Sequence, residues 1–126
     1  MNVSCERRTA LMLLRQVGRR PAPGAKTDQD VQVMAAKGRL FFINSHTTAA
    51  CEALVLKPGA FWIRRALLER VLRSFDEKEI IILEADRNRM TIGRFSCSVR
   101  LWQAKPIPPE GVELIPGTLR LSGGGG

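Results

Sequence analysis

The sequence predicts an α+β fold in which one unit, a strand followed by a helix and three more strands, occurs twice. Amphipathic helical segments lie at residues 6–17 and 64–75, and each follows a short apolar run typical of a strand. A shift of 58 residues aligns the two units and matches Leu14 with Leu72. We therefore expect a duplicated βαβββ arrangement, with two helices packed on antiparallel sheets of about eight strands in all.

The first unit begins with a strand at residues 2–5. Apolar residues of the following helix recur three and four positions apart and would face the core. A stop signal and a polar loop follow over residues 18–30. The later elements we expect are an alternating strand at 31–35, a hairpin turn at 37–38, a returning strand at 39–43 and a third strand at 47–55.

The second unit repeats this course after the turn at residues 57–59. An apolar strand runs directly into the helix at 64–75, and three strands follow, at 79–84, 89–92 and 94–102. The first hairpin is matched to the second as follows: Val31 and Val33 with Ile80 and Ile82, and residues 41–43 with 90–92. This match supports an internal duplication.

The length of 126 residues predicts one domain, and the composition divides the chain at about residue 104. Residues 1–104 would form that domain. Residues 105–126 are a Pro- and Gly-rich C-terminal extension, in which residues 111–121 carry enough apolar side chains for one or two short strands. The closing glycines predict a disordered tail.

The net charge of +8 favours a polyanion, and nucleic acid first, as the partner. The positive charge is arranged along the polar faces of the two helices. The candidate nucleic-acid-binding residues, which the resemblance described below makes DNA-binding residues, are Arg7, Arg8, Arg15, Arg19, Arg20, Arg64, Arg65, Arg70 and Arg73. A solvated helix face is the alternative. Glu69 lies within the second stripe and would weaken it or pair with Arg65 or Arg73.

No catalytic or metal site is predicted. The single histidine, His46, and the cysteines Cys5, Cys51 and Cys97 match no ligand spacing, and no third group orients a nucleophile–base pair. The cysteines are interpreted as buried thiols in a reducing compartment. No apolar stretch reaches the length of a membrane span, and no signal peptide is evident, so we expect no membrane partner, no cofactor and a cytoplasmic location.

The aromatic residues favour packing over base stacking. They make up only 6% of the chain, and Trp62 and Trp102 are interpreted as core or interface residues. Phe41 and Phe42 are adjacent on a predicted strand, so they would point to opposite faces. One of them is therefore a candidate for an interface or a partner-peptide groove, with a covered sheet edge as the alternative.

Several short motifs, in their order and spacing, resemble bacterial DNA polymerase III β sliding clamps. The resemblance spans about residues 1–102, which corresponds to one clamp domain. The segments that carry it are residues 1–7 with the following helix, 37–40, 58–59, 88–92 and 95–101.

This resemblance implies a DNA-clamp (processivity) fold, with helices lining a ring of six domains around duplex DNA and sheets on the outside. It implies a non-enzymatic processivity factor that binds double-stranded DNA without sequence preference and tethers a polymerase or other partners. A single-domain chain would then form a homo-oligomer. The alternative is an interaction protein that modulates a clamp, a clamp loader or a polymerase without encircling DNA. In that case residues 111–121, which resemble the first strand of a following domain, would belong to a shortened relative.

Overall fold

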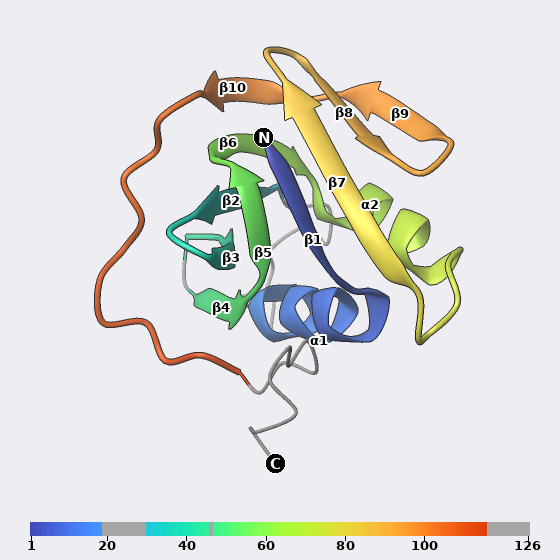
Figure 1. Ribbon diagram of the computed structural model, residues 1–126, viewed down its shortest axis with the longest axis horizontal. Coiled ribbons are helices and arrows are strands. Elements are labelled where there is room, and N and C mark those ends of the chain that lie inside the picture. The colour runs from blue at the N-terminus through green and yellow to red at the C-terminus, as the bar shows by residue number, and fades with distance from the viewer. Residues whose placement is uncertain (19–29, 46, 116–126) are drawn as a thin grey trace, which may run out of the picture.

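The structure, a computed structural model, describes residues 1–18, 30–45 and 47–115 (Figure 1). The elements of the first half are β1 (Asn2–Glu6), α1 (Arg7–Gly18), β2 (Asp30–Ala36), β3 (Arg39–Ile43), β4 (Thr48–Glu52) and β5 (Leu54–Lys57). Those of the second half are β6 (Gly59–Arg64), α2 (Arg65–Arg73), β7 (Ile80–Asp86), β8 (Arg89–Ile92), β9 (Phe95–Ser98) and β10 (Arg100–Gln103). The predicted α+β class, with two helices on antiparallel sheets, is confirmed.

The strands form two five-stranded sheets whose orders are identical once the halves are exchanged. Sheet 1 has the order β5-β1-β7-β8-β9, and sheet 2 has the order β10-β6-β2-β3-β4. Each half therefore gives its first and last strands to one sheet and its three middle strands to the other. The duplication seen in the sequence is present in the topology as well.

The expected count of about eight strands is wrong, because the last predicted strand of each half divides in two. The chain bends at Ala53 between β4 and β5, and at Val99 between β9 and β10. The Ala53 N–H donates to the Gly38 carbonyl at 3.0 Å, and the Val99 N–H donates to the Asn88 carbonyl at 2.8 Å. The hairpin turn of each half thus holds the bend that carries the chain from one sheet to the other.

The hairpins of the two halves match at an offset of 50 residues, one position away from the predicted match. Val31 corresponds to Ile81, and both are buried, whereas the predicted partner Ile80 is 49% exposed. Phe42 likewise corresponds to the buried Ile92. A slip of one residue moves every side chain of a strand to the other face. Because residues 80–83 are all apolar, the sequence pattern alone does not show which of them face the core.

One main core joins both sheets and both helices. α1 packs on β1, β3 and β4, α2 packs on β6, and the helices contact each other. The largest fully buried side chains of the helices are Leu13 and Leu14 in α1 and Leu68 and Leu72 in α2. Their apolar faces meet the sheets, and their polar faces are left to solvent.

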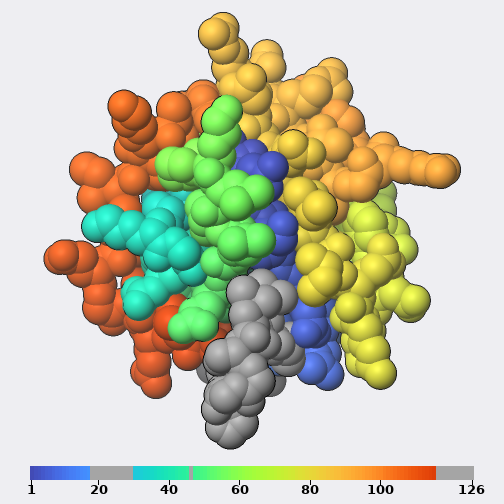
Figure 2. Space-filling view, viewed as in Figure 1, coloured from blue at the N-terminus to red at the C-terminus, as the bar shows by residue number. Residues whose placement is uncertain are grey.

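A second apolar cluster lies on the opposite face of sheet 2. This outer cluster consists of Met34, Phe41, Ala50 and Ala60, all buried. Residues 104–115 leave β10, run past the β2–β3 hairpin, and cover the outer cluster with Val112 and Leu114 (Figures 1 and 2). Phe42 belongs to the main core, and Phe41 is 1% exposed. Phe41 is therefore covered, but on the face of an inner strand and not at a sheet edge as the second alternative expected, and no open groove lies there.

Candidate nucleic-acid interface

α1 presents arginines and neutral residues to solvent. Its exposed positions are Arg8, Met12, Arg15 and Gln16. The first turn holds no acidic residue, and the same is true of α2. Positive charge at this end opposes the helix dipole and costs about 0.3–1 kcal/mol per charge. Arg15, Arg70 and Arg73 lie in the last turns, where the dipole favours positive charge, so only the arginines at the helix starts carry this cost.

The loop after α2 holds the start of α1. The Arg7 N–H donates to the Glu79 carbonyl at 2.8 Å, and the Arg8 N–H donates to the Glu77 carbonyl at 3.2 Å. These carbonyls satisfy N–H groups that have no partner within the helix. The Arg7 Nε also donates to the Asp76 carbonyl at 3.4 Å. Arg7 is half-buried and tied to this loop, whereas the Arg8 side chain is exposed.

The β3–β4 turn holds the end of α1. The Asn44 side-chain amide donates to the Val17 carbonyl, and its Oδ1 accepts the Thr47 N–H at 2.7 Å. With both ends anchored to the body of the domain, α1 is a rigid support for the side chains on its outer face.

α2 repeats the exposed pattern of α1 at the 58-residue shift. Its exposed positions 66, 70 and 73 correspond to 8, 12 and 15 in α1. They carry Ala66, Arg70 and Arg73. The residue before the helix, Arg64, is also exposed and takes the N-cap position without a side-chain cap bond.

Glu69 pairs with two arginines of α2. Its carboxylate accepts from Arg65 Nη1 at 2.9 Å and from Arg73 Nη2 at 3.1 Å. The Arg65 side chain is only 18% exposed, and its buried Nε has no hydrogen-bond partner. Arg65 is therefore a structural residue at the base of the helix. The Arg73 side chain is 59% exposed, so it remains accessible to solvent.

The structure thus divides the predicted arginines into three groups. Five are exposed: Arg8, Arg15, Arg64, Arg70 and Arg73. Arg7 and Arg65 are half-buried. Arg19 and Arg20 lie outside the described residues. α1 and α2 contact each other and both bury their apolar faces, so their exposed arginines lie on two adjacent helices. We call Arg8, Arg15, Arg70 and Arg73 the basic helix surface. Within the described parts of α1 and α2, every exposed charged side chain is an arginine.

Guanidinium groups suit a phosphate backbone. Arginine binds phosphate through paired donors, and such contacts carry no sequence information. The neutral exposed side chains of the two helices, Met12, Gln16 and Ala66, leave room between the charges. This surface can bind a polyanion without reading bases.

The chemistry of an enzyme or a metal centre has no support in the described residues. No three His, Cys, Asp or Glu side chains among them lie close enough to hold a metal ion. Burial raises the pKa of the Cys51 thiol to about 12 and that of Cys5 further, so both stay protonated at neutral pH. His46 lies outside the described residues. No helix in residues 1–18, 30–45 or 47–115 is long and apolar enough to cross a membrane.

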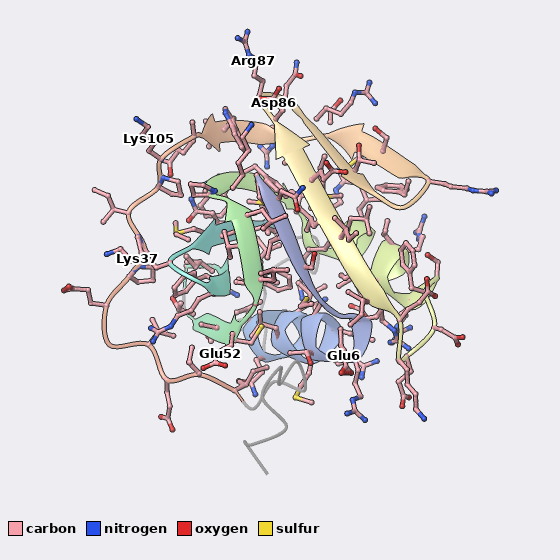
Figure 3. The ribbon with its side chains drawn as sticks, viewed as in Figure 1. Glu6, Lys37, Glu52, Asp86, Arg87 and Lys105 are labelled. Atoms are coloured by element: carbon pink, nitrogen blue, oxygen red, sulfur yellow. The ribbon has the colours of Figure 1, made fainter. Side chains whose placement is uncertain are left out.

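Sequence reasoning missed an open cleft of about 730 Å³ where β1, β7 and β10 meet. Its charged lining is mixed: Lys57, Arg89 and Lys105 lie there with Glu84 and Asp86. These residues come from separate strand ends, so no pattern along the chain indicated that they meet. Arg87 and Lys105 lie at the end of the molecule away from α1 (Figure 3).

The chain has two duplicated halves, each of which contributes strands to both sheets, and two helices that pack together and carry exposed arginines. This arrangement is the DNA-clamp fold. Solved sliding clamps share it. The chain superimposes on a DNA polymerase III subunit beta clamp from Bartonella birtlesii with a TM-score of 0.67 and 19% identity, over 79% of this chain and 30% of that one. The clamp of Pseudomonas aeruginosa gives 0.64 and 15%, over 88% and 32%. A Helicobacter pylori clamp bound to a DNA ligase peptide gives 0.60 and 17%, over 86% and 34%.

This likeness is one of fold. The sequence matches no family model and no curated protein sequence. The chain spans about a third of the length of the clamps it matches. The chain is therefore similar to one domain of a sliding clamp, with little sequence in common.

Proposed function

We propose that the chain is a subunit of a sliding-clamp-like processivity factor, in which the basic helix surface faces duplex DNA. The observation that carries this proposal is the charge of the two helices: their exposed charged side chains are all arginines, on a domain of clamp fold. A protein that slides must hold phosphates without reading bases. The affinity of such arginine contacts falls as salt rises, and the slope of this fall is proportional to the number of phosphates bound.

The assembly in this proposal is a homo-oligomeric ring, with six copies around the DNA. The chain covers 30% of the Bartonella clamp, so each copy would supply one domain of the circle. Closed rings of identical subunits use head-to-tail contacts that repeat around an axis. The ring would act without catalysis, in the cytoplasm, by tethering partners such as a polymerase or a clamp loader. The Helicobacter pylori clamp, bound to a DNA ligase peptide, is a precedent for such tethering.

A second candidate is a single-domain interaction protein that modulates a clamp, a loader or a polymerase. The edge of β4 favours it, because Leu114 and Ile115 of the same chain occupy that edge. A sheet edge covered in this way offers no strand for a neighbour. Solution mass separates the two candidates: light scattering should find a species near six chains for the ring, and a monomer or dimer at all concentrations for the modulator.

The proposed DNA surface is tested with a variant that removes its four positive charges. Changing Arg8, Arg15, Arg70 and Arg73 to Gln keeps helix propensity nearly constant. We expect the affinity for duplex DNA, measured by fluorescence anisotropy, to fall at least tenfold and its dependence on salt to flatten. Arg65 is left unchanged because of its buried pair with Glu69.

The matched control removes the same charge elsewhere. Arg39, Arg87, Arg94 and Lys105 are exposed and lie outside the two helices, and changing them to Gln should leave the DNA affinity within about threefold. Equal losses in the two variants would mean that the affinity follows net charge alone. The basic helix surface would then not be the DNA-binding face.

A further inference from the structure

The outer cluster has no counterpart in sheet 1. The topology of the two halves assigns an equivalent position to each of its residues, through a shift of 58 for β1 and β6 and of 50 for β2, β3, β7 and β8. For β4 and β9 the equivalence follows from pairing, because Phe41 pairs with Ala50 and Thr91 with Ser96. The equivalents of Met34, Phe41, Ala50 and Ala60 are Glu84, Thr91, Ser96 and Asn2. Sheet 1 is polar here and needs no cover. Sheet 2 is apolar here and requires one.

The cover is a short segment, which we call the strap, residues 112–115. Leu114 forms a parallel bridge with Ala50, and the Ile115 N–H donates to the Ala50 carbonyl at 2.8 Å. Val112 and Leu114 are half-buried on the outer cluster, and Ile115 packs against the main core. Within residues 112–115, the strap is held by this bridge and by the side chains of Val112, Leu114 and Ile115.

A proline-rich connector, residues 104–111, joins the strap to β10. Ile107 within it is 90% exposed, and Pro106, Pro108 and Pro109 stiffen it. Such a segment extends by about 3.1 Å per residue, which gives a reach of roughly 25 Å. This reach takes the strap around the side of sheet 2 (Figure 1). It would equally take the strap to the outer cluster of a domain placed beside it.

We propose that the strap is exchanged between copies, so that the strap of each chain covers the outer cluster of its neighbour in the assembly. The exchange reuses every contact seen within one chain. It leaves no apolar cluster bare, which simple release of the strap would do. Repeated head to tail, it joins single domains into a closed circle. The exchanged strap would join neighbouring domains without a covalent bond, whereas a longer clamp chain joins its domains through the backbone.

This proposal rests on the proposed assembly. In an isolated chain the connector holds the strap at an effective concentration of about millimolar near its own cluster, and the exchange is disfavoured. The exchange requires that, in a ring, a neighbouring outer cluster lies within the same reach. The exchanged form then competes on equal terms.

A disulfide between strap and cluster tests the exchange. Ala50→Cys and Leu114→Cys place thiols on paired strands about 4.8 Å apart, within the Cα range that a disulfide spans. The background carries Cys97→Ser and keeps the buried Cys5 and Cys51. The protein is oxidised at high concentration with DNA present, and it is then run on a denaturing gel without reductant. We expect a covalent ladder of dimers and larger species.

The opposite result is a monomer with an internal disulfide, seen as a mass loss of two hydrogens. If light scattering of the same sample shows an oligomer, the exchange is wrong and the assembly stands. If it shows a monomer, the exchange and the proposed assembly both fall. Each single-cysteine variant should give monomers on the gel.

Connector length supplies a second test that needs no disulfide. Deleting residues 107–110 leaves a connector too short to reach the chain's own cluster, and forced exchange should raise the fraction of oligomer. Inserting eight Gly and Ser residues after Ala104 should lower it. Light scattering across concentrations measures both. An oligomer fraction that is the same in both variants would overturn the exchange.

Discussion

Glu69 forms ion pairs with both Arg65 and Arg73, which have different roles. It neutralises the half-buried Arg65 and at the same time withdraws part of the charge of Arg73 from solvent. A carboxylate at this position stabilises the start of α2, and it weakens the basic face. Stability and the proposed DNA binding therefore make opposite demands on this single residue.

Glu69→Gln should separate the two effects. The free energy of unfolding should fall by about 1–3 kcal/mol. Arg65 would lose its charged partner, and its buried Nε has no hydrogen-bond partner to compensate. The affinity for duplex DNA should rise, because the helix surface gains one net positive charge. Urea unfolding and fluorescence anisotropy measure the two quantities. Glu52→Gln, on an exposed position of β4, is the control and should change neither by much.

Gly59 is required by the tryptophan of a neighbouring strand. A Cβ at this position would lie 2.5 Å from the Trp102 ring and 2.9 Å from the Met1 side chain. The Trp102 ring therefore packs closely against the backbone of β6 at Gly59, as a structural residue that contacts the main core. It forms part of the wall of the mixed-charge cleft.

Gly59→Ala should destabilise the domain by about 1–3 kcal/mol, the usual cost of overpacking. The loss should be smaller in a Trp102→Leu background, where the ring that would clash is gone. Chemical denaturation of the four proteins of this double-mutant cycle measures the coupling. If the two losses simply add, the ring does not set the requirement for glycine.

At the scale of whole elements, the sequence predicted both helices, both hairpins and the duplication, because each has a local signal. The spacing of apolar residues predicts the helices, and short polar segments between apolar runs predict the hairpin turns. In the structure these turns begin at Lys37 and Arg87, whose φ angles are 52° and 53°. The bends at Ala53 and Val99 have no such signal. Alternation of apolar residues continues across each bend, and only the hydrogen bonds to the hairpin turns make the chain change sheets.

Two further features depend on contacts far apart in the chain. The cover over Phe41 comes from residues 112–115, and those few apolar side chains lie in a loop-like composition. At the helices, sequence reasoning found the arginines but not their division into exposed and structural groups. That division arises from burial of Arg65 and from the loop carbonyl beside Arg7.

The strap makes a strong prediction about sheet 2. Phe41 lies on the face opposite the main core, where truncation usually costs little. Because Val112 and Leu114 cover it, Phe41→Ala should instead lower the free energy of unfolding by about 3–5 kcal/mol. Ile82→Ala, on the outer face of sheet 1 and 51% exposed, is the matched control and should cost under about 1 kcal/mol. Thermal and urea unfolding compare them. Similar small losses would mean that the strap leaves this face open.

At the scale of the whole molecule, the distribution of charge matters more than its total. The exposed positive charges of the described residues include one set on the helices and another at the hairpin tips, and an assembly would use these two sets differently. Arginines on the helices would face an enclosed DNA. Arginines on the hairpins would face solvent, where they keep the assembled particle dispersed.

Encirclement predicts a dependence on DNA topology that surface binding does not. Assembled on a nicked circular plasmid, the protein should stay with the DNA through gel filtration at high salt, because a closed ring has no end to leave by, even when salt screens its phosphate contacts. Cutting the plasmid once should release it. Blocking both ends of the cut DNA with bound streptavidin should restore retention. If retention on open linear and circular DNA is equal, the chain binds DNA from one side, and the arginines of α1 and α2 form an open docking face.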